Sequence, residues 1–287
     1  MSPAKYLIAG RNGQLAQAFI KAFEQRSLLY AAPEEKELDI TDPDRIEAVT
    51  RAFHPDVIIN CAAYNLVDKA EDEREKVYLV NTTGPQNLAR AARTHRARMV
   101  HFGSDYVFDG AKVNGLYGEG DAVNPLNEYG RSKLAGEQAV LGESPGNLVL
   151  RLSWVYGDGK QNFIYKLAEW ARNSEYLKIA CDEFSVPTST RTIVDVTLKA
   201  LEQGVSGLYH LTNSGYCSRY EWAKLVLSAI GVRKFIRPVS MDEFNLPAKR
   251  PKFSAMSNEA LSRLLGVGIP EWGEAVTAFL REQGDMK

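Results

Sequence analysis

Tyr6-Leu7-Ile8-Ala9-Gly10-Arg11-Asn12-Gly13-Gln14-Leu15-Ala16 is the stretch that decides the fold. A short apolar run leads through a glycine-containing turn into a segment over 15–23 with the apolar spacing of a helix. In a doubly wound α/β fold, this order places a helix N-terminus against the phosphates of a dinucleotide. The pattern Gly-x-x-Gly-x-x-Ala therefore predicts a dinucleotide site, with an ordinary tight turn as the alternative.

The rest of the N-terminal half repeats this alternation of apolar runs and helical segments. We expect strands over 6–9, 28–31, 57–60, 99–102 and 148–152, and helices over 15–23, 42–53 and 77–94. The apolar runs lack period-two alternation, which is typical of strands buried on both faces of a parallel sheet. Right-handed crossovers then give a doubly wound, Rossmann-like parallel sheet covered by helices.

After residue 154 the elements become looser and prolines more frequent. We expect helices over 162–173, 191–203, 218–230 and 271–282, with strands near 177–180, 207–212 and 235–238. The pattern indicates a smaller, partly interleaved α/β substrate domain. The predicted division is 1–154 plus about 185–212 for the dinucleotide-binding domain, and about 155–184 plus 213–287 for the substrate (nucleotide-sugar) domain.

Composition excludes several classes of protein. The chain of 287 residues is 45% hydrophobic and 25% charged with a formal net charge of -1, so we expect a sizeable core and no nucleic-acid partner. The N-terminus carries no signal-peptide hydrophobic region and no apolar stretch is long enough to span a membrane, which predicts a cytoplasmic protein without a membrane partner. Three separated cysteines and four unclustered histidines predict no metal site.

Tyr129 and Lys133 lie four residues apart in a predicted helix, so the phenol and the ammonium share one face. A neighbouring cation lowers the pKa of a phenol, which suits a proton donor to a carbonyl oxygen. The spacing alone is not specific, because Tyr156 and Tyr220 repeat it. Ser104 follows the fourth predicted strand, at the sheet edge where ligands of such folds bind, and this context singles out Tyr129. An exposed tyrosine–lysine pair is the alternative.

Candidate cofactor contacts follow the ends of the predicted strands. Arg11 is a candidate partner for a 2′-phosphate, with a solvated arginine as the alternative, and no carboxylate closes the second predicted strand. Asp39 is either part of the adenine border or a loop carboxylate before the next helix. The predicted cofactor contacts are Gly10, Arg11, Asn12, Gly13, Gln14, Leu15, Asp39, Ile40, Ala62, Ala63, Tyr64, Tyr129 and Lys133.

These motifs together resemble those of the extended short-chain dehydrogenase/reductases, and more narrowly those of the dTDP-4-dehydrorhamnose reductase family. The resemblance covers most of the chain and rests on the runs at 60–64, 67–71, 104–110, 132–137 and 151–157. The Ser-Asp-Tyr-Val-Phe-Asp-Gly run at 104–110 is far more specific than the tyrosine–lysine spacing.

The resemblance implies reduction of the C4 ketone of dTDP-4-dehydro-L-rhamnose to dTDP-L-rhamnose with NADPH or NADH. It implies that Tyr129 protonates the developing alkoxide, that Lys133 holds the nicotinamide ribose and tunes Tyr129, and that Ser104 hydrogen-bonds the same oxygen. The implied substrate contacts are Ser104, Asp105, Trp154 and Arg250. A core position for Trp154 and a solvated basic loop around Arg250 are the alternatives.

Other functions stay open at this point. A reductase or an epimerase acting on another nucleotide sugar would use the same fold, and an epimerase would retain its NAD during purification. The regulatory subunit of methionine adenosyltransferase is similar to this family and is a non-catalytic partner. Some family members pair through a magnesium site that uses a glutamate of the first helix, and residues 16–20 contain none. We therefore expect no metal-bridged dimer, and leave monomer or homodimer open.

Overall fold

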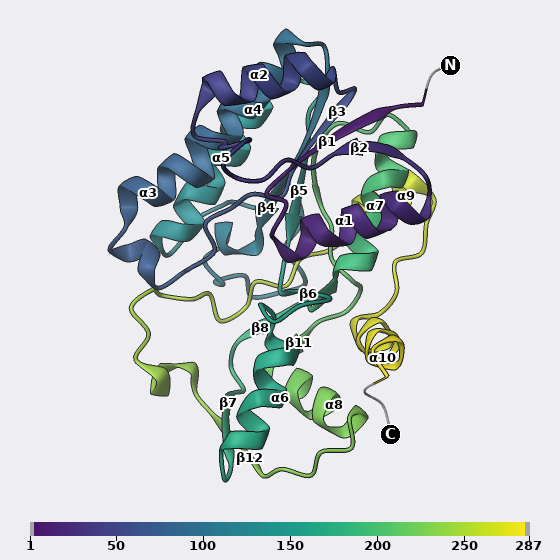
Figure 1. Ribbon diagram of the computed structural model, residues 1–287. Coiled ribbons are helices and arrows are strands. Elements are labelled where there is room, and N and C mark those ends of the chain that lie inside the picture. The colour runs from purple at the N-terminus through teal and green to yellow at the C-terminus, as the bar shows by residue number, and fades with distance from the viewer. Residues whose placement is uncertain (1–2, 285–287) are drawn as a thin grey trace.

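Six parallel strands form one central sheet, in the order β10-β5-β4-β3-β1-β2. The structure is a computed structural model that describes residues 3–284. The strands of this sheet are β1 (Lys5–Ala9), β2 (Leu29–Ala31), β3 (Val57–Asn60), β4 (Arg98–Ser104), β5 (Leu148–Leu152) and β10 (Gly207–His210). Figure 1 shows helices on both faces of this sheet and a smaller lobe beyond the carboxyl ends of its strands. The predicted fold class is confirmed.

Burial on both faces explains the apolar strands. Leu7, Ile8 and Ala9 of β1 are 0% exposed, and Leu7 lies opposite Ile58 of β3 in parallel register. The chain leaves β1 toward β2 on one side and later returns to β3 on the other side. This reversal creates a crevice beyond the carboxyl ends of β1 and β3, where doubly wound folds bind ligands.

Each face of the sheet has its own helical cover (Figure 1). The helices on one face are α1 (Gln14–Gln25), α7 (Thr190–Glu202) and α9 (Glu259–Leu265), and those on the other are α2 (Pro43–Phe53), α4 (Gly84–Thr94) and α5 (Glu128–Glu143). Phe19, Phe23 and Ile193 belong to the first core, whereas Ile46 and Leu88 belong to the second. The sequence patterns did not predict α9.

The helix predicted over 77–94 is interrupted. The structure has α3 (Arg74–Tyr78), a π-helical turn η2 (Leu79–Thr83) and then α4. Short π-helical turns inside α-helices often occur at functional sites, because the wider turn redirects side chains. Here the turn leaves Leu79 44% exposed and buries Asn81 to 1% exposure. The strand expected near 207–212 is also shorter, and ends at His210.

The smaller lobe has a separate core around Tyr156, Leu167 and Trp222. Its longer elements are α6 (Phe163–Asn173), β7 (Leu177–Ala180), α8 (Arg219–Ala229), β12 (Ile236–Val239) and α10 (Trp272–Glu282). Its short elements are β6 (Val155–Tyr156), β8 (Phe184–Ser185), β9 (Thr188–Ser189), β11 (Cys217–Ser218) and η4 (Met241–Phe244). The predicted domain boundaries stay a prediction, and α9 packs through Leu261 on the core of the sheet.

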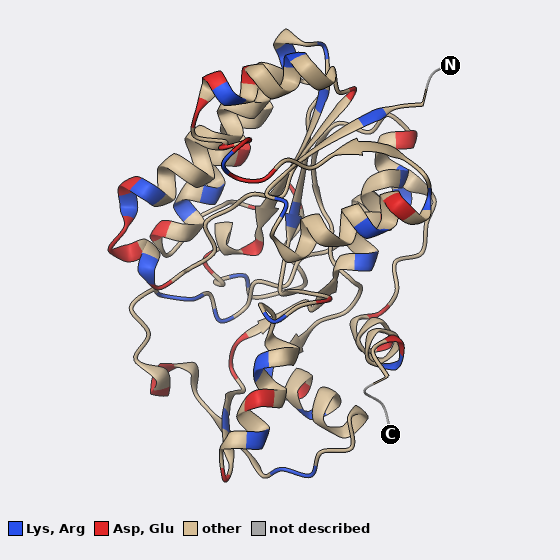
Figure 2. Cartoon of the chain, viewed as in Figure 1, with Lys and Arg blue, Asp and Glu red and all other residues tan. Residues whose placement is uncertain are grey.

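Acidic and basic segments are interspersed over the helices of both lobes (Figure 2). This mixture agrees with the balanced composition of 35 basic and 36 acidic residues. Within residues 3–284, none of the helices has the length and apolar character needed to cross a membrane.

Candidate active site

The turn between β1 and α1 requires glycine at its first position. Gly10 has a φ of +83°, and a Cβ atom there would lie 2.5 Å from the backbone nitrogen of Ala62. The N–H of Gly13 donates to the carbonyl of Gly10 at 2.9 Å and closes the turn. The backbone after β1 therefore lies so close to the backbone after β3 that a side chain at position 10 has no room.

The first turn of α1 is suited to an anion. Gly13 is the N-cap and provides no side-chain hydrogen bond, and the first turn contains no acidic residue. The leading N–H groups of a helix have no partner within the helix, and the helix dipole adds positive potential there. Ala16 is 0% exposed and packs in the core of the sheet. This cradle fits the pyrophosphate of a dinucleotide.

The end of the second strand carries a carboxylate that the sequence patterns did not reveal. Glu34, three residues after β2, forms an ion pair of 3.3 Å with Arg11 and accepts a hydrogen bond of 3.2 Å from Asn12. Arg11 also donates to the carbonyl of Ala32 at 2.8 Å. The expectation that no carboxylate closes this strand is therefore wrong for the folded chain, because the loop folds back onto the glycine turn.

The other predicted cofactor positions divide into surface and core. Asp39 accepts hydrogen bonds from the backbone and hydroxyl of Thr41, and lines a shallow cleft with Glu34. Ile40 is 5% exposed and packs in the core beneath α4. Tyr64 is 8% exposed and donates to Glu73. Half-buried predicted positions near the crevice are Gln14, Leu15, Ala62 and Ala63.

Ser104 and Tyr129 meet at the carboxyl end of β4. Ser104 is the last residue of that strand, and its hydroxyl lies beside the phenol of Tyr129. Tyr129 lies in the first turn of α5, is 9% exposed, and contacts Asn65 Oδ1 through its hydroxyl at 3.4 Å. The fold thus brings together two residues that are 25 positions apart in the sequence.

Burial, and not the neighbouring lysine, dominates the acidity of Tyr129. Desolvation raises the pKa of Tyr129 to about 12, and the neighbouring Ser104 side chain lowers it only partly. The sequence argument for a lowered pKa is therefore wrong in this structure, because the phenol is removed from water. The side chain is consequently a fully protonated phenol at neutral pH.

Lys133 lies one helical turn after Tyr129 and points toward β4. Its Nζ donates to the carbonyl of Phe102 at 2.6 Å, and the side chain is 3% exposed. Burial lowers the pKa of Lys133 to about 8, and the carboxylate of Glu137 on the same helix opposes this shift. The ammonium is therefore retained at neutral pH beneath the same sheet edge.

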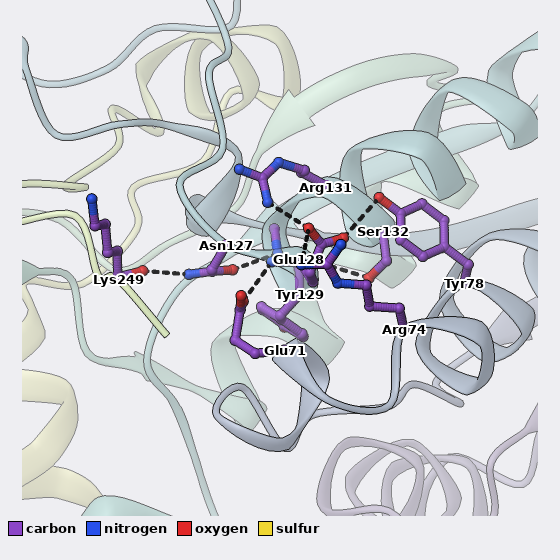
Figure 3. A network of polar contacts seen from close by, with 10 residues as sticks. Glu71, Arg74, Tyr78, Asn127, Glu128, Tyr129, Arg131, Ser132 and Lys249 are labelled. Atoms are coloured by element: carbon purple, nitrogen blue, oxygen red, sulfur yellow. Dashed lines mark hydrogen bonds and ion pairs between the residues drawn. The ribbon is translucent and has the colours of Figure 1, made fainter. Parts of the chain in front are cut away.

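The N-terminus of α5 is fixed by polar contacts from two other segments (Figure 3). Asn127 caps the helix through Gly130 at 2.7 Å and donates to the carbonyl of Lys249 at 2.6 Å. The carboxylate of Glu71, in the helical turn η1 (Lys69–Glu71), accepts from the backbone of Glu128 at 2.8 Å. These contacts hold the turn that carries Tyr129.

The close approach of this turn also requires a glycine. A Cβ atom on Gly130 would lie 2.3 Å from the carbonyl oxygen of Tyr106, in the helical turn η3 (Asp105–Val107). Tyr106 in turn packs edge-on against the ring of Tyr129, with ring centroids 5.6 Å apart. Because Gly130 has no side chain, the first turn of α5 can pack against η3, and this brings the phenol of Tyr129 to the end of β4.

Asn81 is a positioning residue that sequence reasoning missed. Its amide makes two hydrogen bonds to the backbone of Tyr64, of 2.8 and 3.0 Å, and donates to Ser132 at 3.0 Å. It thus ties the loop after β3 to α5. The available signal was its spacing, because Asn81 lies four residues after the buried Val77 on the inward face of the helix.

The predicted substrate residues occupy two environments. Asp105 is 2% exposed and is absent from the lining of the main cleft. Trp154 and Arg250 both line that cleft, which has a volume of about 450 Å³ and is formed mostly by residues of the smaller lobe. Arg250 also forms an ion pair with Asp68 at 2.8 Å.

Trp154 adopts a backbone conformation that is rare for a large residue. Its φ is +38°, a conformation that costs about 1–3 kcal/mol outside glycine and often marks functional sites. The guanidinium of Arg219 lies 3.6 Å from its ring centroid, and the ring of Trp222 is stacked on it at 5.6 Å. An aromatic wall with a fixed cation is suited to a base and a phosphate.

The remaining reactive groups do not form a second centre in the described part of the chain. Burial raises the pKa of the Cys61 thiol, which disfavours the reactive thiolate. Among residues 3–284, no three acidic, histidine or cysteine side chains are grouped as metal ligands.

Known proteins match this chain over nearly its full length. The family model described as RmlD substrate binding domain matches residues 4–284. A dTDP-4-dehydrorhamnose reductase of Mycobacterium tuberculosis is 38% identical over 96% of this chain and 92% of that protein. A crystal structure of a dTDP-4-dehydrorhamnose reductase from Clostridium acetobutylicum has a TM-score of 0.94 and 34% identity, with coverages of 98% and 99%. Another, from Bacillus anthracis in complex with NADP, has a TM-score of 0.94 and 33% identity, with coverages of 98% and 100%.

Proposed function

The chain belongs to the dTDP-4-dehydrorhamnose reductase family with the RmlD substrate binding domain, and from this premise we propose its reaction. It reduces the C4 ketone of dTDP-4-dehydro-L-rhamnose to dTDP-L-rhamnose, with NADPH or NADH as cofactor. The observation that carries the proposal is the meeting of Ser104 and Tyr129 at the end of β4, with the Lys133 ammonium on the same edge.

The cofactor pyrophosphate is assigned to the N–H groups of the Gly10–Gly13 turn and the first turn of α1. When bound, the reduced nicotinamide supplies a hydride to C4 of the sugar. Arg11 and Asn12, in the turn after β1, contact the loop that follows β2. In doubly wound folds the adenosine ribose of a dinucleotide lies at the end of this strand. The Arg11–Glu34 ion pair offers a cation to a 2′-phosphate and a carboxylate to a 2′-hydroxyl, which is why both cofactors stay in the proposal.

Tyr129 is assigned as the proton donor. As negative charge develops on the C4 oxygen, the proton moves from the phenol oxygen to that oxygen. A pKa of about 12 keeps the donor protonated at neutral pH. The phenolate that is left is stabilised by the charge of Lys133.

The substrate nucleotide is assigned to the cleft beside Trp154. The cleft is lined by aromatic rings, including Phe163 and Trp222, and by the cations of Arg219 and Arg250. Aromatic faces stack on a base, and guanidinium groups bind phosphate oxygens in a bidentate manner. A dTDP-sugar lying in this cleft would direct its hexose toward the sheet edge, where Ser104 and Tyr129 lie.

The direct test is an assay of NADPH oxidation with dTDP-4-dehydro-L-rhamnose, with the sugar product identified by NMR. Net oxidation with formation of dTDP-L-rhamnose is expected. No net oxidation, together with NAD retained through purification, would identify an epimerase. A different product would identify a reductase of another nucleotide sugar, and no turnover at all would favour a non-catalytic binding role.

A variant pair tests the assigned proton donor. Tyr129→Phe is expected to lower kcat about 100- to 10,000-fold, the usual contribution of a general acid, while NADPH affinity changes little. Tyr220→Phe is the matched control, because Tyr220 and Lys224 repeat the same spacing on α8 with the lysine 5.6 Å from the ring centroid. Equal losses in the two variants would remove Tyr129 from its proposed role.

A further inference from the structure

A buried carboxylate at the end of β4 joins three separate segments. Asp105 Oδ2 accepts hydrogen bonds from the hydroxyls of Ser185 at 2.7 Å and Ser254 at 2.6 Å. Its Oδ1 accepts from Ser104 at 3.3 Å. The four side chains all belong to residues that are no more than 5% exposed. Both carboxylate oxygens are therefore occupied by hydroxyl donors of the protein itself.

Two of these donors lie in chain segments that also contribute residues to the lining of the proposed substrate cleft. Ser185 lies in β8, directly after Glu183 and Phe184, and Ser254 lies in the segment that follows Arg250. The two segments run side by side, because Phe184 donates to the carbonyl of Lys252 at 2.7 Å and Ser254 donates to the carbonyl of Phe184 at 2.9 Å. Glu183 and Arg250 line the cleft. Asp105 thus fastens this wall to the sheet.

The third donor is the hydroxyl beside Tyr129. Ser104 Oγ accepts from the backbone N–H of Tyr106 at 3.2 Å and donates to Asp105. An ionised carboxylate can only accept hydrogen bonds, so the Ser104 proton is directed to Asp105. The Ser104 oxygen is thereby held beside the phenol of Tyr129.

We propose that Asp105 is a positioning residue, which sets the direction of the Ser104 hydroxyl and holds the cleft wall of Ser185 and Ser254 against the end of β4. This inference rests on the proposed function for the role of Ser104. It differs from direct binding of the sugar, because a sugar hydroxyl would have to displace a serine from a carboxylate that is almost fully buried. Asp105 acts on the reaction through the serines that it holds.

The proposal has a pH signature. Burial raises the pKa of Asp105 to about 6, whereas the serine hydroxyls and Arg219 of α8 lower it. The other titratable groups that face it are Tyr106 in η3 and Tyr129 in α5. Below that pKa the carboxyl group becomes a donor itself, and one serine hydroxyl loses its acceptor. The rate should therefore fall as the pH drops through about 6.

The stability of the fold should change with the opposite sign. The folded-state pKa of about 6 lies above the ordinary aspartate value of 3.8, so between these two pH values the folded chain binds a proton that the unfolded chain does not. The contribution of Asp105 to folding stability therefore rises as the pH falls from 6 toward 4. Asp105→Asn should remove this component from the pH dependence of Tm.

The experiment compares Asp105→Asn, the double variant Ser185→Ala/Ser254→Ala and the control Asp109→Asn with the wild type. Asp109 belongs to the same Ser-Asp-Tyr-Val-Phe-Asp-Gly run, and its carboxylate also accepts several hydrogen bonds, but none from Ser104. We measure kcat and KM for the dTDP-sugar from pH 5 to 9, the Kd of NADPH, and Tm over the same pH range.

Asp105→Asn is expected to lower kcat about 100-fold, the scale of a misplacement by about 1 Å, with NADPH binding unchanged. The serine double variant should move the acid limb of the kcat profile to higher pH, because it removes donors that lower the Asp105 pKa. Asp109→Asn should change neither kcat nor the position of the acid limb of its pH profile. Should Asp105→Asn fail to fold, the serine variant still provides the test.

A higher KM with unchanged kcat in Asp105→Asn would make it a sugar ligand and overturn the proposal. An unshifted acid limb in the serine double variant would overturn it as well. If the wild type does not reduce the sugar, the proposed function has failed, and a crystal structure of Asp105→Asn still decides the present point. A Ser104 side chain and a cleft wall left in place would contradict it, and a rotated Ser104 with a displaced wall would support it.

Discussion

The proposed cofactor side and the proposed substrate side of this molecule are built in different ways. The proposed cofactor turn is one contiguous stretch over 10–16, closed by a hydrogen bond between Gly13 and Gly10. The cleft is assembled from Trp154, Glu183, Arg219 and Arg250, which come from four segments of the chain. A site formed by one short segment can be predicted from its sequence, because local backbone constraints produce a recognisable pattern. A cleft formed by residues from distant segments has no such pattern.

Gly10→Ala should break the cofactor side with the largest effect. The new Cβ would meet the Ala62 backbone at 2.5 Å in a left-handed conformation, so we expect a loss of about 3 kcal/mol or more in unfolding free energy. The affinity for NADPH should fall at least about 100-fold, because the phosphate cradle must distort. Chemical denaturation and NADPH titration measure the two effects.

Gly115→Ala is the matched control for this change. Gly115 has a φ of +71°, but nothing lies within 4 Å of its Cβ position. The unfolding free energy should fall by only about 1–2 kcal/mol, the cost of placing alanine in the left-handed conformation, and the affinity for NADPH should not change. Equal effects of the two substitutions would mean that the close approach of the two backbones is unimportant.

Trp154→Ala should break the substrate side alone. We expect the KM for the dTDP-sugar to rise about 10-fold, which corresponds to about 1.4 kcal/mol of lost contact, while the Kd of NADPH stays within about twofold. Trp170→Ala is the control, because Trp170 lines the same cleft but is 44% exposed on α6. A larger effect of Trp170 would move the nucleotide toward the outer part of the cleft.

Arg11→Ala tests whether Arg11 sets the preference for NADPH over NADH at the proposed cofactor site. The variant is expected to reduce the ratio of kcat/KM for NADPH over NADH about 10-fold, because a guanidinium is the natural partner of a 2′-phosphate. Glu34→Gln frees Arg11 from its ion pair of 3.3 Å and should raise the same ratio. An unchanged ratio in both variants would place the 2′-position elsewhere.

The smallest effect is expected at the Asp68–Arg250 pair. Arg250→Ala should raise the KM for the dTDP-sugar about fivefold, because a cation that lines the cleft is lost. Asp68→Asn leaves that cation in place and should change KM less than about twofold. Similar increases in both variants would show that Arg250 acts through its ion pair with Asp68 and not through the substrate.

Local physics made much of the molecule predictable. The runs at 6–9 and 57–60 have no polar alternation because parallel strands are buried on both faces, and the structure places strands there. The helix starting at Pro43 was visible from Asp42, whose side chain accepts from the backbone of Asp44 and Arg45. The placement of Ser104 at a strand end and of Tyr129 at a helix start likewise followed from element boundaries.

Other features depended on contacts that no local pattern encodes. Glu34 reaches Arg11 because the loop after β2 folds back, and the predicted helix over 77–94 is interrupted by a π-helical turn over 79–83. α9 escaped prediction because its seven residues are too short for a clear helical period.

The sequence by itself determined the order of the central-sheet strands along the chain, the glycine turn and the chemical identity of Ser104, Tyr129 and Lys133. Only the tertiary structure decided how acidic these groups are and what surrounds them. A neighbouring lysine in sequence argued for a lowered Tyr129 pKa, yet burial raises it to about 12. Likewise, the sequence resemblance implied that Asp105 contacts the substrate. In the structure Asp105 is buried and accepts hydrogen bonds from two serines that are distant in sequence, Ser185 and Ser254. The physical reason is that desolvation and hydrogen bonding sum over all neighbours in space, which the chain supplies from segments far apart.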